Sequence, residues 1–154
     1  LMEQVSGRAG RKEATGRVLV QTSNPSHPIL KYVQLHDYKG MAAEELPKRR
    51  QYQYPPYTRL VHLGFRHKMK EIVTDAANRF ADAMKNKYGD YITGPAEPVV
   101  NKVRNQYLME LLIKIPKDTR LMHQCRLDIF KNIAILHNEK RFRSVVIVPD
   151  VDVM

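Results

Sequence analysis

Two glycine–arginine steps close to the amino end offer the clearest chemistry in the sequence. The segment runs Gln4-Val-Ser-Gly-Arg8-Ala-Gly-Arg11. Guanidinium groups neutralise phosphate oxygens through forked hydrogen bonds, and glycine lets the backbone turn tightly enough for two arginines to reach one site. The spacing therefore predicts a phosphate site that uses Arg8 and Arg11. The alternative is a plain nucleic-acid-binding segment, because glycine–arginine-rich loops also contact nucleic acid without catalysis.

A second group combines cations with a tyrosine at the start of an apolar, alternating segment. It consists of Lys102, Arg104, Gln106 and Tyr107. Lysine and arginine can follow a phosphate backbone while a base stacks on an exposed tyrosine, so these residues are candidate DNA contacts. The alternative for Tyr107 is structural. It is in phase with Leu111, and residues two apart in a strand share a face, so Tyr107 could begin the buried face of that strand.

A third candidate is the aromatic and basic cluster around the tandem prolines at 55 and 56, which consists of Tyr52, Tyr54, Tyr57 and Arg59, with Tyr54 and Arg59 as its candidate DNA contacts. The same combination of ring stacking and phosphate contact makes it a possible DNA contact. Tandem prolines disfavour helix and stiffen the chain. The favoured alternative is therefore that the tyrosines pack between two domains around a rigid linker.

The balance of charge points to an anionic partner. The chain has 26 lysines and arginines against 16 acidic residues, a formal net charge of +10 at pH 7. Residues 1–50 hold nine basic and five acidic residues and residues 51–154 hold seventeen and eleven, so no single tail explains the excess. Clustered cations gain affinity for nucleic acid by releasing counterions. Simple solubility is the alternative.

Other classes of protein are disfavoured by what the sequence lacks. It has no run of eighteen apolar residues, so no membrane segment is expected. Cys125 is the only cysteine, which excludes an internal disulfide or a cysteine-rich zinc site, and favours a reducing, cytoplasmic setting. No Gly-x-x-x-x-Gly-Lys-Ser/Thr phosphate loop is present. We therefore expect no ATPase activity, no unwinding and no bound metal from this chain alone.

From Tyr57 onward, the spacing of apolar residues switches between the period of a strand and that of a helix. The expected elements are a strand at 58–66, a helix at 69–87, a bent or edge strand within 90–104, a strand at 107–115, a helix at 118–138 and a strand at 143–151. This order predicts an α+β fold of the ferredoxin-like, split βαβ type. Such a fold has one antiparallel sheet with two helices on one face.

Shorter elements are expected before Tyr57. A β-branched run at 16–22 predicts a buried strand. A helix is expected from about Ser26, its N-cap, with Pro28 in the first turn, and a second helix at 37–50. Pro47 lies late in that helix and predicts a kink or an early end. Residues 52–57 are expected to form an extended linker.

Several segments resemble the PriA family of DNA helicases. The motif at 4–11 is similar to the last signature of superfamily-two helicases, Gln-x-x-Gly-Arg-x-Gly-Arg. The family resemblance then continues through nearly the whole chain, in Gly-Arg-Val-Leu-Val-Gln-Thr at 16–22, Asn-Pro-Ser-His-Pro at 24–28, Tyr-Pro-Pro-Tyr at 54–57, Gly-Pro-Ala at 94–96, Arg-Asn-Gln-Tyr at 104–107 and Asp-Val-Asp at 150–152. Leu108 and Met109 depart from it, because the family often has Arg-Trp there.

The resemblance implies a division of the chain and a set of cofactors. Residues 1–25 would be the end of a second RecA-like helicase lobe, 26–56 a helical and proline–tyrosine linker, and 57–154 a C-terminal DNA-binding domain. Because the chain opens on Leu1 within the motif, we expect it to be a piece of a longer protein. That protein would bind ATP with Mg²⁺ and two zinc ions. Gln4, Arg8 and Arg11 would face its ATP, both arginines on the γ-phosphate.

The resemblance also implies a function. The longer protein would move 3′-to-5′ on DNA with ATP hydrolysis, recognise stalled or abandoned forks in the bacterial nucleoid and promote primosome assembly. Its partners would be forked and single-stranded DNA, primosome proteins and single-stranded DNA-binding protein. This chain would supply DNA binding and domain packing. A stand-alone ferredoxin-like nucleic-acid-binding module and a primosome docking module are the alternatives, and dependence of binding on salt separates DNA contact from docking.

Overall fold

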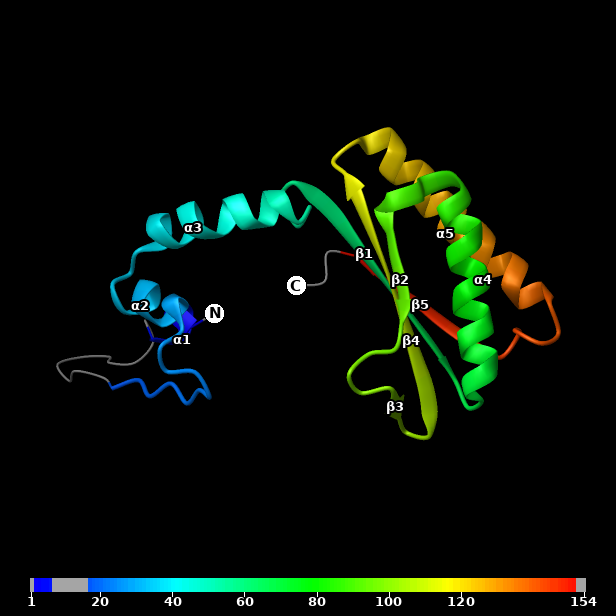
Figure 1. The fold of residues 1–154 in the computed structure, drawn as a ribbon, viewed down its shortest axis with the longest axis horizontal. Coiled ribbons are helices and arrows are strands. Elements are labelled where there is room, and N and C mark those ends of the chain that lie inside the picture. The colour runs from blue at the N-terminus through cyan, green and yellow to red at the C-terminus, as the bar shows by residue number, and fades with distance from the viewer. Residues whose placement is uncertain (1, 7–16, 152–154) are drawn as a thin grey trace. The chain divides into compact units, whose positions relative to one another are not determined.

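A computed structural model of the chain describes residues 2–6 and 17–151. The chain divides into two compact units, Leu1–Lys48 and Arg49–Met154. All five described strands belong to the second unit, whereas the first is helical (Figure 1). The finer division expected from the sequence, with boundaries after residues 25 and 56, stays a prediction. No helix among the described residues is long and apolar enough to cross a membrane.

The first unit contains α1 (Met2–Ser6), α2 (Pro28–Gln34) and most of α3 (Tyr38–Gln51). The N-cap of α2 is His27 and not Ser26, because the Nδ1 atom of His27 accepts a hydrogen bond from the Ile29 amide at 3.2 Å. Proline fits the first helical position, where its missing N–H costs nothing. The helix α3 continues through Pro47 to its end, so the early stop expected at that proline does not occur.

The contacts that join α2 to α3 are polar. Neither helix has a fully buried residue. The Tyr32 hydroxyl donates to Glu44 at 2.8 Å, and the Lys48 ammonium donates to the same carboxylate at 2.7 Å. The hydrogen bonds from Lys48 and Tyr32 hold the pKa of the Glu44 carboxyl below its ordinary value. The first unit therefore has polar links between its helices in place of a large apolar core.

The prediction of a buried strand at 16–22 is wrong for residues 17–22, the part of this range that the structure describes. Residues 17–22 form no strand and are exposed, with Leu19 at 96%. A β-branched run becomes a strand only when a neighbouring strand satisfies its backbone hydrogen bonds. No described strand lies within this unit, so the apolar pattern has nothing to pair with.

The second unit has the predicted split βαβ topology. Its strands are β1 (Thr58–His67), β2 (Ile92–Ala96), β3 (Lys102–Val103), β4 (Gln106–Pro116) and β5 (Val146–Val151), and its helices are α4 (Lys70–Tyr88), α5 (Thr119–Asn138) and the short η1 (Gly89–Tyr91). The sheet order is β2-β4-β1-β5 with every pair antiparallel, and β3 pairs with β4 alone. The fold class predicted from the sequence is confirmed.

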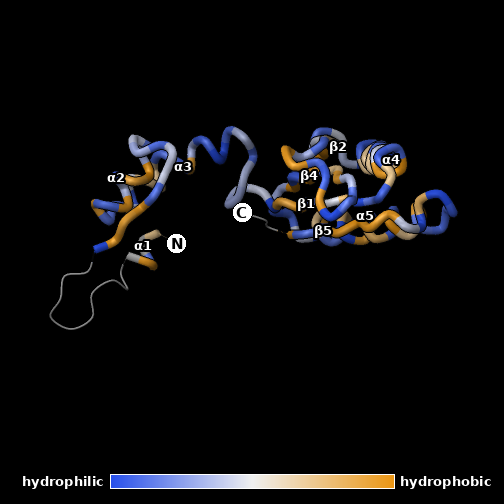
Figure 2. The backbone as a smooth tube through the Cα atoms, turned by 90° about the horizontal axis from the view of Figure 1, so that it is seen from below, coloured by the Kyte–Doolittle hydropathy of each residue, from blue (hydrophilic) through white to orange (hydrophobic). Residues whose placement is uncertain are grey.

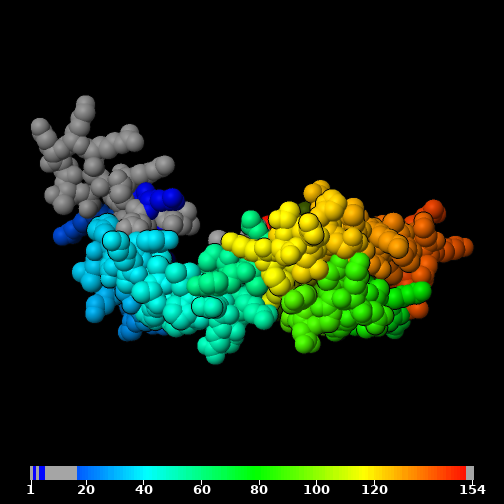
Figure 3. Space-filling model, turned by 90° about the horizontal axis from the view of Figure 1, so that it is seen from above, coloured from blue at the N-terminus to red at the C-terminus, as the bar shows by residue number. Residues whose placement is uncertain are grey.

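Alternate residues of β1 and β4 face the two helices and make the core. Leu63, Phe65, Leu111 and Ile113 are at most 1% exposed, and the rings of Phe65 and Phe80 meet edge to face at 5.5 Å. In Figure 1 both long helices cover the same face of the sheet, and Figure 3 shows them side by side. Apolar segments, orange in Figure 2, gather where the strands meet α4 and α5.

Two proline-containing segments differ in how well they were predicted. Residues 52–57 form turns and not an extended linker. The Tyr54 amide donates to the Arg49 carbonyl at 2.7 Å, and the Thr58 hydroxyl donates to the Gln53 carbonyl at 2.8 Å.

The bent or edge strand expected within 90–104 is confirmed, since β2 lies at the sheet edge with an irregular register after Thr93. A Cβ atom on Gly94, which has φ of 100°, would lie 3.1 Å from a β4 carbonyl oxygen.

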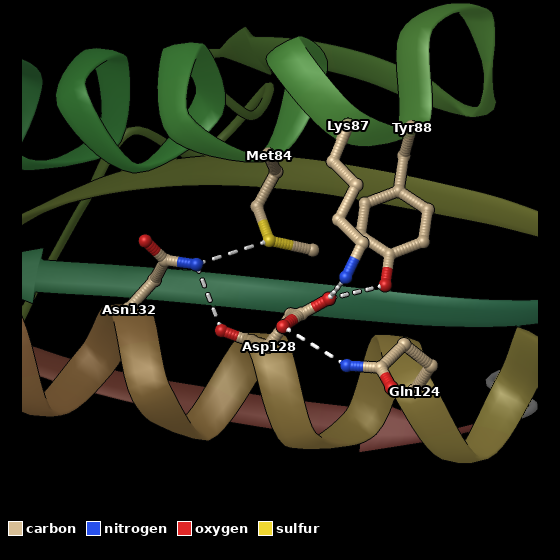
Figure 4. A network of polar contacts seen from close by, with 6 residues as sticks. All are labelled: Met84, Lys87, Tyr88, Gln124, Asp128 and Asn132. Atoms are coloured by element: carbon tan, nitrogen blue, oxygen red, sulfur yellow. Dashed lines mark hydrogen bonds and ion pairs between the residues drawn. The ribbon is translucent and has the colours of Figure 1, made fainter.

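A polar network between α4 and α5 is centred on Asp128 (Figure 4). Its carboxylate accepts hydrogen bonds from the Tyr88 hydroxyl at 2.6 Å and from the Lys87 ammonium at 2.5 Å. The hydrogen bonds from Lys87 and Tyr88 hold the pKa of the Asp128 carboxyl below its ordinary value. Burial and the hydrogen bond to Asp128 raise the pKa of Tyr88. The side chain of Asp128 is only 17% exposed, so the network is part of the helix interface.

Replacing Asp128 with alanine should destabilise the second unit by about 1–3 kcal/mol, because the buried Tyr88 hydroxyl loses its partner. Urea unfolding of both proteins measures the change. Since the folded pKa of Asp128 is depressed, its contribution is complete above the unfolded pKa of about 4 and is lost as the pH falls through the folded value. The difference between the two proteins should therefore narrow in acid. Asp82→Ala, at an exposed position of α4, is the control; an equal destabilisation there would contradict the assignment.

Candidate nucleic-acid interface

The structure brings four of the predicted DNA contacts together in one hairpin. Lys102 pairs with Tyr107 across β3 and β4, and Gln106 starts β4. Between the strands, Arg104 and Asn105 form a two-residue turn with φ of 48° and 61°. A turn with positive φ at both central residues matches the right-handed twist of the two strands, and asparagine tolerates that conformation well. We call residues 102–107 the basic hairpin.

Tyr107 lies between the core and a cation. Its side chain is partly buried against the core cluster, and the Lys102 ammonium lies 4.7 Å from the centre of its ring. This packing favours the structural alternative for Tyr107 over base stacking. The ring then acts on Lys102, because a cation over an aromatic face is attracted by the ring quadrupole and is held in place.

A chain of polar contacts anchors the loop before the basic hairpin. The Lys70 ammonium, at the start of α4, lies 2.5 Å from Glu97, and Asn101 donates to the same carboxylate at 2.9 Å. Both contacts hold the pKa of the Glu97 carboxyl below its ordinary value. The Leu108 amide donates to the Asn101 carbonyl at 2.9 Å. The base of the hairpin is thus tied to α4, while its tip at Arg104 stays exposed.

Tyr54 and Arg59 lie at the opposite end of the sheet from the hairpin, and on different faces of it. The Lys114 ammonium lies 4.2 Å from the Tyr54 ring centre and donates to the Tyr52 carbonyl at 3.2 Å. Lys114 alternates with the buried Ile113 and so projects from the face that the helices leave open. Arg59 pairs with Ile115 and shares the helix-covered face. The predicted cluster of Tyr54 with Arg59 is therefore not a single surface.

Arg59 takes part in a basic hollow, which the sequence pattern did not reveal. The hollow has a volume of about 380 Å³ and is lined by Arg59, Lys117, Thr119, Met122, His123 and Arg126. The four α5 residues of this set are spaced i, i+3, i+4 and i+7, which places them on one helix face. That spacing was visible in the sequence, but the proximity of Arg59 depends on how β1 lies against the start of α5.

The basic hairpin and the basic hollow are too far apart to bind one phosphate group. Lys102 is opposite Tyr107 in β4, and Arg59 is opposite Ile115, eight residues further along the same strand. A strand rises about 3.3 Å per residue, so about 26 Å separates the two positions. The structure therefore joins Lys102, Arg104, Gln106 and Tyr107 and separates them from Tyr54 and Arg59.

The nucleotide-facing residues expected near the amino end are largely outside the described part. Arg8 and Arg11 lie outside the described residues, and Gln4 is exposed in α1. Their predicted roles with ATP stay predictions. Within the described residues, no group of three or more histidine, cysteine or acidic side chains is placed to hold a metal ion.

Comparison with known proteins gives a family match over the second unit. The model of the Primosomal protein N C-terminal domain matches residues 50–153. A replication restart protein PriA of Treponema pallidum is 39% identical over 119 residues, 75% of this chain and 18% of that protein. Those of Synechocystis sp. and Bacillus subtilis are 37% and 33% identical, covering 75% and 79% of this chain, and 14% and 15% of their own lengths. The chain spans less than a fifth of these relatives.

The turn of the basic hairpin gives a test of the local geometry. Replacing Asn105 with valine should destabilise the second unit by about 1–2 kcal/mol, because a β-branched residue resists positive φ. Asn105→Gly is the matched control and should cost little, since glycine adopts this conformation freely. Urea unfolding of the three proteins measures both changes. Equal stability of the valine and glycine variants would rule out the left-handed turn.

Proposed function

The chain belongs to the Primosomal protein N C-terminal domain family, and we propose that it provides the DNA-binding C-terminal part of an ATP-dependent replication restart helicase. The relatives named above are called replication restart proteins, which supports the process. Their greater length supports a longer parent protein that contains the motor. In that proposal, this chain binds DNA and packs against the rest of the helicase.

Unpaired cations in the basic hairpin are the observation that carries the proposal. Lys102 and Arg104 are exposed and form no ion pair among the described residues. Elsewhere in the second unit, Lys70, Arg79 and Lys87 each have a carboxylate within 2.6 Å. A carboxylate nearby cancels the field that would attract phosphate, so cations without one are the better candidates for backbone contact.

The activity of the parent protein completes the proposal. It would hydrolyse ATP with Mg²⁺, with Gln4, Arg8 and Arg11 at the nucleotide, and would carry two zinc ions held by segments other than this chain. It would move 3′-to-5′ on forked and single-stranded DNA in the bacterial cytoplasm. Its protein partners would be primosome components and single-stranded DNA-binding protein. The guanidinium motif supports the nucleotide role, because such groups neutralise charge on a transferring phosphoryl group.

A primosome docking module is the second candidate, and the open face of the sheet favours it. Val146 and Val148 are 38% and 47% exposed there, and no helix of the second unit covers that face in the part of the chain described. By strand alternation, the aromatic side chains of β1 and β4, Phe65 and Tyr107, project from the other face. The open face thus suits an apolar protein partner better than stacked bases. Docking of this kind should respond weakly to salt.

Exchanging Lys102 for glutamine together with Arg104 for asparagine tests the DNA-binding proposal. Asparagine suits the positive φ of the turn, so the double variant removes two charges and keeps the hairpin. Binding of a duplex of about 20 base pairs should weaken roughly tenfold, and the slope of log K against log salt should fall by about 1–2. Fluorescence anisotropy across a salt series measures both quantities.

A matched control removes the same charge elsewhere. Lys39 and Lys131 are exposed and unpaired among the described residues, so Lys39→Gln with Lys131→Gln keeps the net charge equal to that of the hairpin variant. This control should bind nearly as well as the unaltered chain. Should both variants lose affinity equally, net charge alone would explain binding. Should the unaltered chain bind no duplex at all, the DNA-binding role would be wrong.

A further inference from the structure

The basic hollow gathers basic side chains from three separate elements. Arg59 comes from β1, Lys117 from the segment between β4 and α5, and His123 and Arg126 from α5. Lys117, His123 and Arg126 form no ion pair among the described residues. The cations, and not the end of α5, make the hollow positive, because the Asp118 carboxylate already caps that helix through the Leu121 amide at 2.8 Å.

An aromatic ring on the same helix lies beside one of these cations. The Arg126 guanidinium lies 6.0 Å from the centre of the Phe130 ring, one helical turn along α5. Phe130 is 52% exposed, so the pair lies at the surface. A guanidinium over a ring keeps its N–H groups available at its edge, and these match the oxygens of a phosphate. Arg126 is therefore oriented before any ligand arrives.

We propose that the basic hollow binds a phosphodiester group of duplex DNA, separate from the one that the basic hairpin binds. The proposal rests on the DNA-binding function proposed above and adds a second point of contact. A phosphodiester carries one negative charge on two oxygens and needs only cations and N–H donors around it. The hollow offers the Arg126 guanidinium, the Lys117 ammonium and the His123 imidazole around a volume of about 380 Å³, and Arg59 also lines it.

An acidic peptide is the competing class of ligand. The hollow shares Arg59, Met122 and Arg126 with an apolar groove of about 430 Å³ between α5 and the strands β1 and β5. However, Lys117, Thr119 and His123 line the hollow and not the groove, and none of them is apolar. The part that is peculiar to the hollow therefore suits a compact anion, and a peptide would need the groove as well.

The distance between the two phosphate contacts sets a minimum length for the DNA duplex that reaches both. The hairpin and the hollow are about 26 Å apart along β4, and neighbouring phosphates of one DNA strand are about 3.4 Å apart along the duplex axis. A duplex must therefore extend over about eight base pairs to reach both sites at once. Within one bound duplex, removal of either site should leave the other intact, so their effects on binding should add.

The test replaces Lys117 and Arg126 with glutamine in the full 154-residue chain. Binding of a duplex of about 20 base pairs should weaken three- to tenfold, and the salt slope should fall by about 0.9 for each phosphate that the variant no longer neutralises. The Lys39→Gln, Lys131→Gln pair is again the control for net charge. Both replaced residues of the hollow are exposed, and equal thermal unfolding by circular dichroism confirms that the variant folds.

A second measurement locates the DNA directly. Acetylation of lysines, followed by mass spectrometry, should show Lys117 protected in the duplex complex and Lys131 equally reactive with and without DNA. Two results together would overturn phosphodiester binding in the hollow and favour a peptide ligand: unchanged reactivity of Lys117, and a Lys117→Gln, Arg126→Gln variant that binds DNA like the control. If the hairpin variant still lost affinity in that case, the DNA-binding function itself would stand. Failure of the unaltered chain to bind duplex would instead remove both proposals.

Discussion

The register of β4 against β1 is the constraint on which the second unit depends. Ten residue pairs, from Thr58 with Pro116 to His67 with Tyr107, place Leu63 and Phe65 beside Leu111 and Met109 under the helices. A slip of one residue would turn this apolar set toward the open face and expose it to water. The same register fixes where the basic residues lie, because it places the basic hairpin at one end of β4 and Arg59 at the other.

The distribution of ion pairs separates structural cations from available ones. Arg79 pairs with Glu139, Arg141 with Asp75, and Lys87 with Asp128, so these contacts link distant parts of the unit. The exposed pairs of Arg79 and Arg141 add little stability each, whereas Asp128 lies in the helix interface, but all three pairs cancel charge locally. The positive charge behind the net +10 is therefore compensated unevenly along the chain. Among the described residues, Lys102 and Arg104 of the basic hairpin and Lys117 and Arg126 of the basic hollow form no ion pair.

Local pattern predicted the second unit and the two helices before it, α2 and α3, but it wrongly predicted a strand at 16–22. The elements from β1 to β5 have apolar residues at strand or helix spacing and cover one another, so pattern and packing agree. The run at 17–22 has the pattern of a strand but no described partner, and strand formation depends on the partner. Within the site, the hairpin residues are adjacent in sequence and were found together. Arg59 and Arg126 meet only through tertiary packing, which no sequence pattern shows.

The aromatic residues at these surfaces act mainly on the protein's own cations. Lys102 lies over Tyr107, Lys114 over Tyr54 and Arg126 over Phe130, so each ring already has a cation at its face. A ring in such a pair is less available for stacking on a base, but the cation it holds has less side-chain entropy to lose on binding phosphate. Base stacking would give affinity for single strands, whereas oriented cations give contact with any phosphate backbone. Under the DNA-binding proposal, this geometry favours recognition of backbone position over base identity.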